Sequence, residues 1–118
     1  MVGDGGTRRL AAILAADVVG YSRLMSVDEV GTLARMTAHL DEIFKPAIAD
    51  HQGHVVKTMG DGLLAEFASA VEAVECAVQI QTAMAKRTND DPEDRRVSFR
   101  IGVNLGDIIF RDSDIFGS

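Results

Sequence analysis

Two short stretches of this 118-residue chain carry residue types suited to chemistry on phosphate groups. In the first, Asp17 follows an apolar run at residues 10–16 and precedes the sequence VVGYS at residues 18–22. A carboxylate at a strand end, followed by a glycine and a helix start, suits phosphate, because free backbone N–H groups and the helix dipole face the ligand. The alternative, that Asp17 only caps local backbone, fits this stretch equally well.

The second stretch is KTMGDG at residues 57–62, which lies between two β-prone runs. Asp-Gly between such runs predicts a hairpin, since glycine adopts the positive φ that a tight turn requires. Side chains alternate along a strand, so Lys57, Met59 and Asp61 are expected to begin on the same side. A turn aspartate beside a solvated strand lysine is the alternative, because short motifs often match by chance.

Hydrophobic periodicity predicts the elements that position these two stretches. A helix over about 27–50 is opened by a capping box at residues 26–29, and Pro46 is expected to kink or break it. A second capping box at residues 69–72 opens a helix that carries apolar positions to residue 84. Strands are expected at residues 10–16, on both sides of the Asp-Gly turn, and at 97–105. Gly106 allows a bend, and residues 108–110 continue that strand or begin another.

This order, β-α-β-β-α-β, predicts an α+β fold of the ferredoxin-like type, with an antiparallel sheet and helices on one face. The first strand and the hairpin can then pair, which brings Asp17 and Asp61 to the same end of the sheet. Two adjacent carboxylates repel each other unless a cation lies between them. Two Mg²⁺ or Mn²⁺ ions satisfy this requirement and support nucleotidyl transfer. With the Gly20 turn holding distal phosphates, the sequence predicts a nucleoside triphosphate as substrate.

Composition limits the other functions open to the chain. The formal charge of −6 argues against broad electrostatic binding to nucleic acid or anionic membranes. No apolar run approaches the roughly 20 residues of a membrane-spanning helix, and no signal peptide is evident. A single cysteine, Cys76, is compatible with a reducing compartment, so we expect a cytoplasmic protein. Residues 1–8 are expected to form a flexible lead to one domain at 9–118.

The remaining candidate ligands are read as structural. His51 and His54 have an H-x-x-H spacing, but with no cysteine and no third histidine nearby a zinc site is not expected. His39 is expected on the outer part of its helix, and Cys76 is expected to be a small core residue.

Three segments together resemble one family. AILAADVVGYS at residues 12–22, KTMGDG at 57–62 and DIFG at 114–117 are similar, in order and spacing, to the class III adenylate/guanylate cyclase catalytic domain, bacterial adenylate cyclases in particular. The resemblance runs from about residue 8 to residue 118. It implies the nucleotide cyclase fold and conversion of ATP to 3′,5′-cyclic AMP and pyrophosphate, by attack of the ribose 3′-hydroxyl on the α-phosphate.

The resemblance also implies a role for each matched residue. Asp17 and Asp61 would hold two Mg²⁺ or Mn²⁺ ions, with the Val18 carbonyl as a further ligand. Backbone contacts to the triphosphate would come from Val19, Gly20, Tyr21 and Ser22. Lys57 and Asp114 match the pair that reads adenine, where guanylate cyclases commonly carry Glu and Cys, so ATP is favoured over GTP. In this family the metal pair and the base-reading pair come from different subunits, which implies a homodimer.

One departure from the family pattern is expected to affect activity. These cyclases usually continue after Asp-x-Phe-Gly with an aspartate and a helix that carries an asparagine and an arginine, whereas here Ser118 stands at the aspartate's place and the chain stops. Losing one such charge-stabilising donor commonly costs on the order of 10²–10³ in rate. We therefore expect a C-terminally truncated domain with little or no activity. A guanylate cyclase and a non-catalytic nucleotide-binding or dimerisation module are the alternatives.

Overall fold

The computed structural model describes residues 7–111 and 114–117, with side chains described for residues 10–106. Most of the expected lead, residues 1–6, and Ser118 therefore lie outside the described residues. The elements follow the order β1 (Thr7–Val18), α1 (Tyr21–Val27), α2 (Glu29–His39), the π-helical turn η1 (Leu40–Phe44), α3 (Lys45–Asp50), β2 (His54–Met59), β3 (Gly62–Phe67), α4 (Ala70–Arg87), β4 (Phe99–Arg111) and β5 (Asp114–Gly117).

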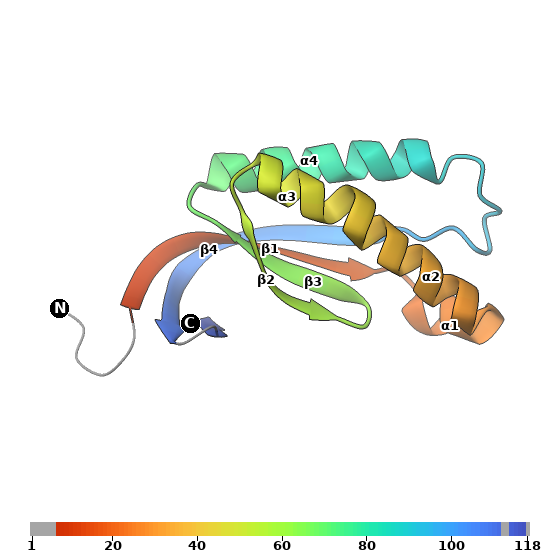
Figure 1. Ribbon diagram of the computed structural model, residues 1–118, viewed down its shortest axis with the longest axis horizontal. Helices are drawn as coiled ribbons and strands as arrows, with labels where there is room; N and C mark the ends of the chain where they lie inside the picture. The colour runs from red at the N-terminus through yellow and green to blue at the C-terminus, as the bar shows by residue number, and fades with distance from the viewer. Residues whose placement is uncertain (1–6, 112–113, 118) are drawn as a thin grey trace.

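The strands form one sheet in the order β2-β3-β1-β4-β5, and each neighbouring pair is antiparallel. Helices α2, α3 and α4 lie together on one face of this sheet (Figure 1). The predicted ferredoxin-like β-α-β-β-α-β arrangement is confirmed, with β5 added at the edge beside β4. Gly106 does not interrupt β4, which runs continuously to Arg111 and curves along its length (Figure 1).

The central strand β1 explains why the sheet and the helices hold together. Its alternate residues are buried towards the helices: Ala12, Leu14, Ala16 and Val18. The intervening Ile13 and Ala15 are only partly buried, so β1 is not enclosed equally on both faces as its continuous apolar run suggested. Burying one face of each strand against helices is the usual way in which an antiparallel sheet forms a core.

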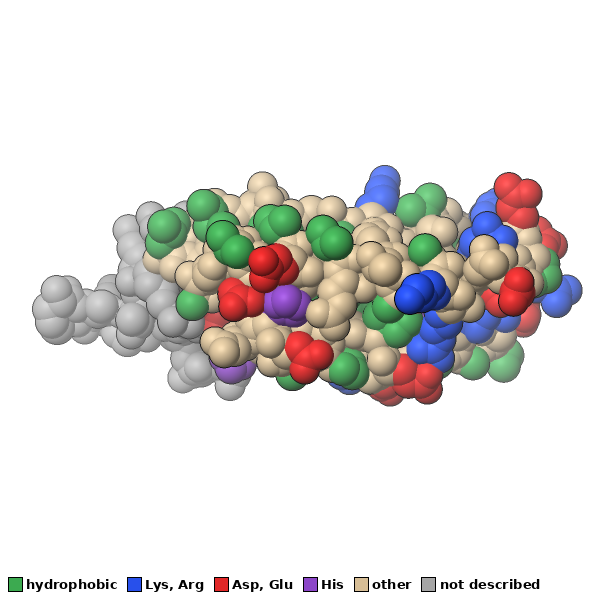
Figure 2. Space-filling model, turned by 90° about the horizontal axis from the view of Figure 1, so that it is seen from above, with side chains coloured by type: hydrophobic (Ala, Val, Ile, Leu, Met, Phe, Trp, Pro, Cys, Tyr) green, Lys and Arg blue, Asp and Glu red, His purple; other side chains and the backbone are tan. Residues whose placement is uncertain are grey.

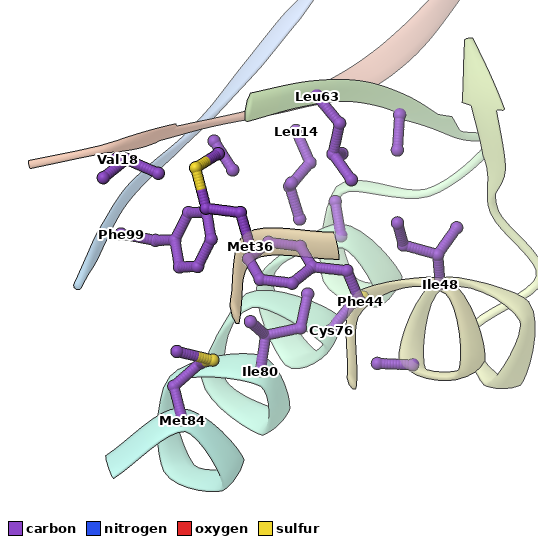
Figure 3. Packing of buried hydrophobic residues seen from close by; sticks show 14 of the residues in the cluster. Leu14, Val18, Met36, Phe44, Ile48, Leu63, Cys76, Ile80, Met84 and Phe99 are labelled. Carbon is purple, nitrogen blue, oxygen red and sulfur yellow. The ribbon is translucent and has the colours of Figure 1, made fainter. Parts of the chain in front are cut away.

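The core fills the space between the sheet and the helical layer (Figure 3). Phe44 from η1 contacts Phe99 from β4 edge-on, with ring centroids 4.6 Å apart. Cys76 from α4 is fully buried there, as predicted, and burial raises the pKa of its thiol to about 11. Truncating a buried phenylalanine typically costs 3–5 kcal/mol, so this aromatic pair contributes much of the helix–sheet packing.

The helical layer differs from the single helix predicted over 27–50. A separate seven-residue helix, α1, comes first, and Asp28 then caps α2 by accepting a hydrogen bond from the Gly31 N–H at 3.0 Å. The predicted capping role of Ser26 is therefore wrong: its hydroxyl donates back to the Arg23 carbonyl inside α1. The capping box at Ser69 is confirmed on its serine side, because the hydroxyl accepts from the N–H groups of Val71 and Glu72.

The irregularity expected at Pro46 lies just upstream of it. Proline lacks an N–H, and its ring clashes with the carbonyl four residues earlier, so it fits only near the start of a helix. The π-helical turn η1 precedes it and lets α3 begin at Lys45 with Pro46 in the first turn. The chain thus accommodates the proline by a wider turn rather than by ending the helix.

His39 was predicted on the outer part of its helix, and this prediction is wrong. It is only 4% exposed and contacts Phe99, with ring centroids 6.5 Å apart. Neither ring nitrogen has a hydrogen-bond partner among the described residues. Burial, followed by the positive charge of Arg87, lowers the pKa of His39 below its ordinary value of 6.5. The ring is therefore held neutral within the core.

We expect Gly62→Ala to destabilise the fold by about 1–3 kcal/mol, the usual cost of overpacking. A Cβ at Gly62 would lie 1.9 Å from the Ala16 carbonyl oxygen, so β3 would have to move away from β1. The matched control is Gly102→Ala on β4, where a Cβ meets nothing within 4 Å. Urea unfolding of both variants measures the difference, and equal midpoints would show that the close approach is not rigid.

His39 should make the protein less stable in mild acid. Its folded-state pKa is lowered, so the unfolded chain binds the proton more readily, and the free energy of unfolding falls as the pH drops through about 6.5. His39→Leu removes this proton site. Urea titrations at pH 8 and pH 5.5 should show a smaller loss of stability in the variant than in the wild type. An equal loss in both proteins would argue against a buried neutral ring.

Candidate functional site

The ends of β1 and β3 bring the two predicted aspartates together at one end of the sheet. Asp17 stands opposite Gly62 in the antiparallel register of these strands. The Val18 N–H donates a hydrogen bond of 2.8 Å to the Asp61 carbonyl, which ties the end of β1 to the β2–β3 turn. The topology predicted this juxtaposition from sequence alone, whereas the role of the two carboxylates stays a prediction.

Glycines allow the loops around this point to approach closely. Gly62 leaves no room for a side chain against the Ala16 carbonyl, as described above. Gly20 adopts a left-handed conformation, with φ of 65°, and begins α1. The Tyr21 hydroxyl lies 3.6 Å from where a Cβ at Gly60 would stand, so the start of α1 adjoins the β2–β3 turn. The loop after β1 and the hairpin turn thus form one surface.

The atoms at Asp17, Val18 and Asp61 that could bind a metal ion are oxygens. The N–H and C=O of one residue in an antiparallel strand point to the same side. Because the Val18 N–H faces the Asp61 turn, its carbonyl is expected to point to the same side of β1. Two carboxylates and a backbone carbonyl are the ligands that Mg²⁺ and Mn²⁺ prefer. The residues present therefore fit a divalent cation of this class.

A residue not predicted from the sequence, Arg100, also occupies this site. It stands opposite Asp17 in the β1–β4 register, and its Nε donates a 2.9 Å hydrogen bond to Asp17 Oδ1. This hydrogen bond raises the pKa of the Arg100 guanidinium above its ordinary value. The Arg100 side chain is 71% exposed and that of Asp17 is 46% exposed, so solvent screens the pair and weakens it. Only the strand register, which joins positions 83 residues apart, identifies it.

The loop after β1 offers fewer free backbone donors than its length suggests. The Val19 N–H already donates to the Ser98 carbonyl at 2.8 Å, which ties this loop to the start of β4. The first N–H groups of a helix have no partner within it, so those at the start of α1 are the donors that face outward. Of the four residues predicted to contact phosphate through their backbone, Val19 has its N–H already occupied. Gly20, Tyr21 and Ser22 are therefore better placed to bind an anion.

The structure does not bring Lys57 and Asp114 together through the sheet. Lys57 is exposed on β2, whereas Asp114 begins β5, and three strands lie between β2 and β5. Lys57, Met59 and Asp61 were predicted to begin on the same side of one strand. This does not hold for Asp61, because β2 ends at Met59 and Asp61 lies in the turn. The orientation of the Asp114 side chain lies outside the described residues.

Comparison with known proteins identifies the family. The profile of the "Adenylate and Guanylate cyclase catalytic domain" family matches residues 7–113. This chain belongs to that family. A crystal structure of an adenylate/guanylate cyclase/hydrolase from Silicibacter pomeroyi superposes with a TM-score of 0.88 at 50% identity, over 96% of this chain and 66% of that one. Cyclases of this family generally depend on divalent metal ions and act on nucleotides.

Curated relatives of this cyclase-family chain are much longer than the matched region. "Putative adenylate cyclase 3" of Rhizobium meliloti (strain 1021) is 58% identical over 110 residues, which is 93% of this chain and 19% of that protein. "Adenylate cyclase" of Streptomyces coelicolor is 30% identical over 94% of this chain and 27% of that protein. The chain thus spans about a fifth to a quarter of these two relatives. Among the described residues, no helix has both the length and the hydropathy to cross a membrane.

Removing the Arg100 side chain should strengthen cation binding at Asp17. A guanidinium and a metal ion compete for the same carboxylate, so Arg100→Ala is expected to raise the affinity for Mn²⁺ by a few-fold. Mn²⁺ titration followed by electron paramagnetic resonance measures the affinity. The matched control repeats the substitution in an Asp17→Asn background, where it should have no effect. Unchanged affinity in the Asp17 protein would show that Arg100 does not compete with Mn²⁺ for this carboxylate.

Proposed function

We propose that this chain provides the metal- and nucleotide-binding part of an adenylate cyclase, which converts ATP to 3′,5′-cyclic AMP and pyrophosphate. One observation carries the proposal: the β1–β3 register sets Asp17 beside the Asp61 turn, within the motifs that this chain shares with its family. The Asp17 side chain is 46% exposed and Asp61 lies in the β2–β3 turn, so both carboxylates can be reached from solvent. Their placement is best explained by a ligand.

Asp17 and Asp61, with the Val18 carbonyl, would hold two Mg²⁺ or Mn²⁺ ions. Such ions, when bound, lower the pKa of an attacking hydroxyl and neutralise charge on the departing phosphate. The chain's own task is to fix the oxygen donors, which the backbone hydrogen bond from Val18 to Asp61 supports. Arg100 must leave Asp17 for a cation to enter, and its exposure makes that exchange inexpensive.

The backbone at Gly20, Tyr21 and Ser22 would bind the triphosphate. The left-handed conformation of Gly20 turns the chain so that the first N–H groups of α1 face outward, where they can donate to phosphate oxygens. The link from Val19 to Ser98 would hold this loop in place during binding. These contacts would align the α-phosphate with the ribose 3′-hydroxyl, which is the nucleophile in this reaction.

Lys57 and Asp114 would read the adenine base. A lysine donates to the ring N1 and a carboxylate accepts from the 6-amino group, a pattern that guanine does not match. We propose that this pair acts across a homodimer, facing the aspartates of the partner subunit. Large apolar side chains that are exposed on the sheet support such an interface, namely Leu10 at 63% and Leu105 at 60% exposure. We also propose that the protein is cytoplasmic, because a single cysteine is compatible with a reducing compartment.

A non-catalytic nucleotide-binding module is the second candidate. The ion pair between Arg100 and Asp17 favours it, because this contact satisfies the carboxylate without any cation. In that case the chain would bind ATP through the α1 loop and the base-reading pair, and the aspartates would be dispensable. The same experiment separates the two functions.

The test uses the 118-residue chain and a chimera that joins it to the segment following the matched region in the Rhizobium meliloti relative. We expect the chain to bind Mn²⁺–ATP, and the chimera to form cyclic AMP from ATP at least tenfold faster than cyclic GMP from GTP. Asp17→Asn or Asp61→Asn should lower cyclic AMP formation by on the order of 10² or more. Asp90→Asn, an exposed carboxylate in the loop after α4, is the matched control.

Each contrary result has a distinct meaning. Tight ATP binding that survives both aspartate substitutions, with no cyclic nucleotide formed, would favour the binding module. Equal rates with GTP would remove the proposed role of Lys57 and Asp114 in selecting adenine. Full activity in the Asp61→Asn chimera would contradict the proposed metal site.

A further inference from the structure

We propose that His51, Glu72 and Glu75 form a second metal site, selective for Zn²⁺ and similar ions, which joins the end of α3 to the first turns of α4. It shares no residue with the Asp17–Asp61 site and is independent of the proposed cyclase chemistry. One ligand atom from each of the three side chains lies within 4.8 Å of the other two. The site lies in the helical layer, where Figure 2 shows histidine and acidic side chains side by side.

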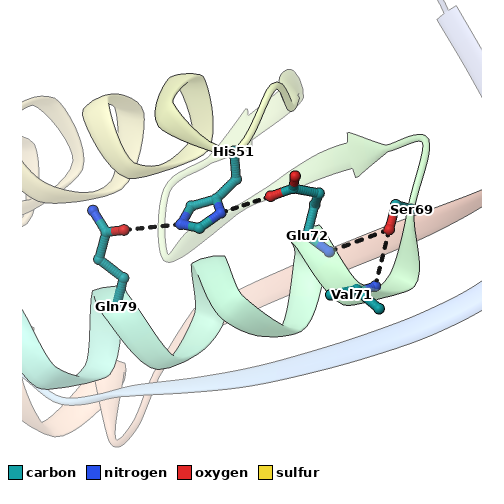
Figure 4. A network of polar contacts seen from close by, with 5 residues as sticks. All are labelled: His51, Ser69, Val71, Glu72 and Gln79. Atoms are coloured by element: carbon teal, nitrogen blue, oxygen red, sulfur yellow. Dashed lines mark hydrogen bonds and ion pairs between the residues drawn. The ribbon is translucent and has the colours of Figure 1, made fainter.

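The two helices hold these side chains towards one another. His51 caps the end of α3, and its backbone is fixed by the hydrogen bonds that close that helix. On α4, Glu72, Glu75 and Gln79 stand three and four residues apart and so share one face of the helix. Because the Ser69 hydroxyl alone caps α4, the Glu72 carboxylate turns away from the cap to meet His51 (Figure 4).

The imidazole of His51 is oriented as a metal ligand usually is. Its Nε2 lies 2.9 Å from the Gln79 side-chain oxygen, and its Nδ1 lies 2.9 Å from Glu72 Oε1 (Figure 4). Both nitrogens therefore face oxygen acceptors, and a neutral ring that keeps its hydrogen on Nε2 leaves the Nδ1 lone pair facing the Glu72 carboxylate. Two acceptors face each other stably only when a proton or a cation lies between them. Metal-binding histidines characteristically donate their other N–H in this way.

The ligand set selects the kind of ion. One imidazole nitrogen and two carboxylates suit Zn²⁺, Co²⁺ or Ni²⁺, whereas Mg²⁺ prefers oxygen ligands alone. Around tetrahedral Zn²⁺ the ligand atoms stand roughly 3.3 Å apart, which follows from bonds of about 2.0–2.1 Å. Glu75 is exposed and Glu72 is partly exposed, so their side chains can rotate to that spacing, and water can complete the coordination. A neutral histidine and two carboxylates also leave no excess charge once the ion binds.

The proton is the natural competitor for this position. The hydrogen bond to Glu72, above all, raises the pKa of His51, and the nearby Glu75 charge adds to the effect. At low pH the imidazolium pairs with Glu72, and at higher pH the free Nδ1 becomes available to a metal ion. Zn²⁺ uptake should therefore release a proton and strengthen as the pH rises.

The experiment titrates untagged protein with Zn²⁺ at pH 8 by calorimetry, and records the melting temperature with and without the ion. It is run on the wild-type chain and on an Asp17→Asn/Asp61→Asn variant, so that uptake at the other carboxylate pair is separated. We expect one Zn²⁺ per chain in the variant and a raised melting temperature, because a ligand that binds only the folded state stabilises it. Substituted Co²⁺ should give the visible absorption of a nitrogen- and oxygen-ligated ion.

Two substitutions decide the outcome. Glu75→Gln should weaken Zn²⁺ binding at least tenfold while leaving the melting temperature of the metal-free protein unchanged, since Glu75 is exposed. The matched control, His54→Ala on β2, should bind Zn²⁺ as the wild type does. Equal affinity in Glu75→Gln, loss of binding in His54→Ala, or absence of any Zn²⁺ uptake in the double variant would each overturn the proposal.

Discussion

The close contact between β3 and β1 at Gly62 is the constraint on which the other features depend. The Ala16 carbonyl occupies the space that any side chain at position 62 would need, so only glycine lets the two strands pair to their ends. That pairing sets Asp17 and Asp61 side by side and lets the Val18 N–H reach the turn. The same register continues through β1 to β4 and brings Arg100 to Asp17. The arrangement of residues at this end of the sheet thus follows from a backbone contact.

The helical layer covers one face of the sheet and supplies the aromatic and histidine side chains that pack against it. The wide turn at η1 admits Pro46 and directs Phe44 into the core against Phe99. The position of His39 in this packing buries a titratable ring whose nitrogens have no hydrogen-bond partner among the described residues. Such a group is tolerated because it remains neutral, and it links the stability of the helix–sheet contact to proton concentration. At the other end of the helical layer, His51 contacts the acidic side chain of Glu72, which favours a proton or a cation between them.

Much of this arrangement follows from local sequence. The Asp-Gly turn, the apolar run before Asp17 and the serine at position 69 each carry their own chemical signal, and the structure has the hairpin, the strand and the helix cap where they were expected. Features that depend on distant contacts could not be predicted. Arg100 lies beside Asp17 only through strand register, and His51 meets Glu72 and Gln79 only because α3 and α4 pack together. The spacing of His51 and His54 was not expected to form a zinc site, and in the structure His51 contacts a carboxylate and an amide from another helix.

Cys76, finally, makes this protein convenient to study by chemical labelling. It is the only cysteine, it is fully buried, and its thiol remains protonated at neutral pH because its pKa is about 11. Thiol reagents react with the thiolate, so the native chain should be nearly inert towards them. The rate of reaction at Cys76 then measures how often the core opens. A cysteine introduced on the surface can then carry a spin label or a fluorophore alone. Distances across the proposed dimer and the motion of the loop after β1 thereby become measurable without first removing the natural residue.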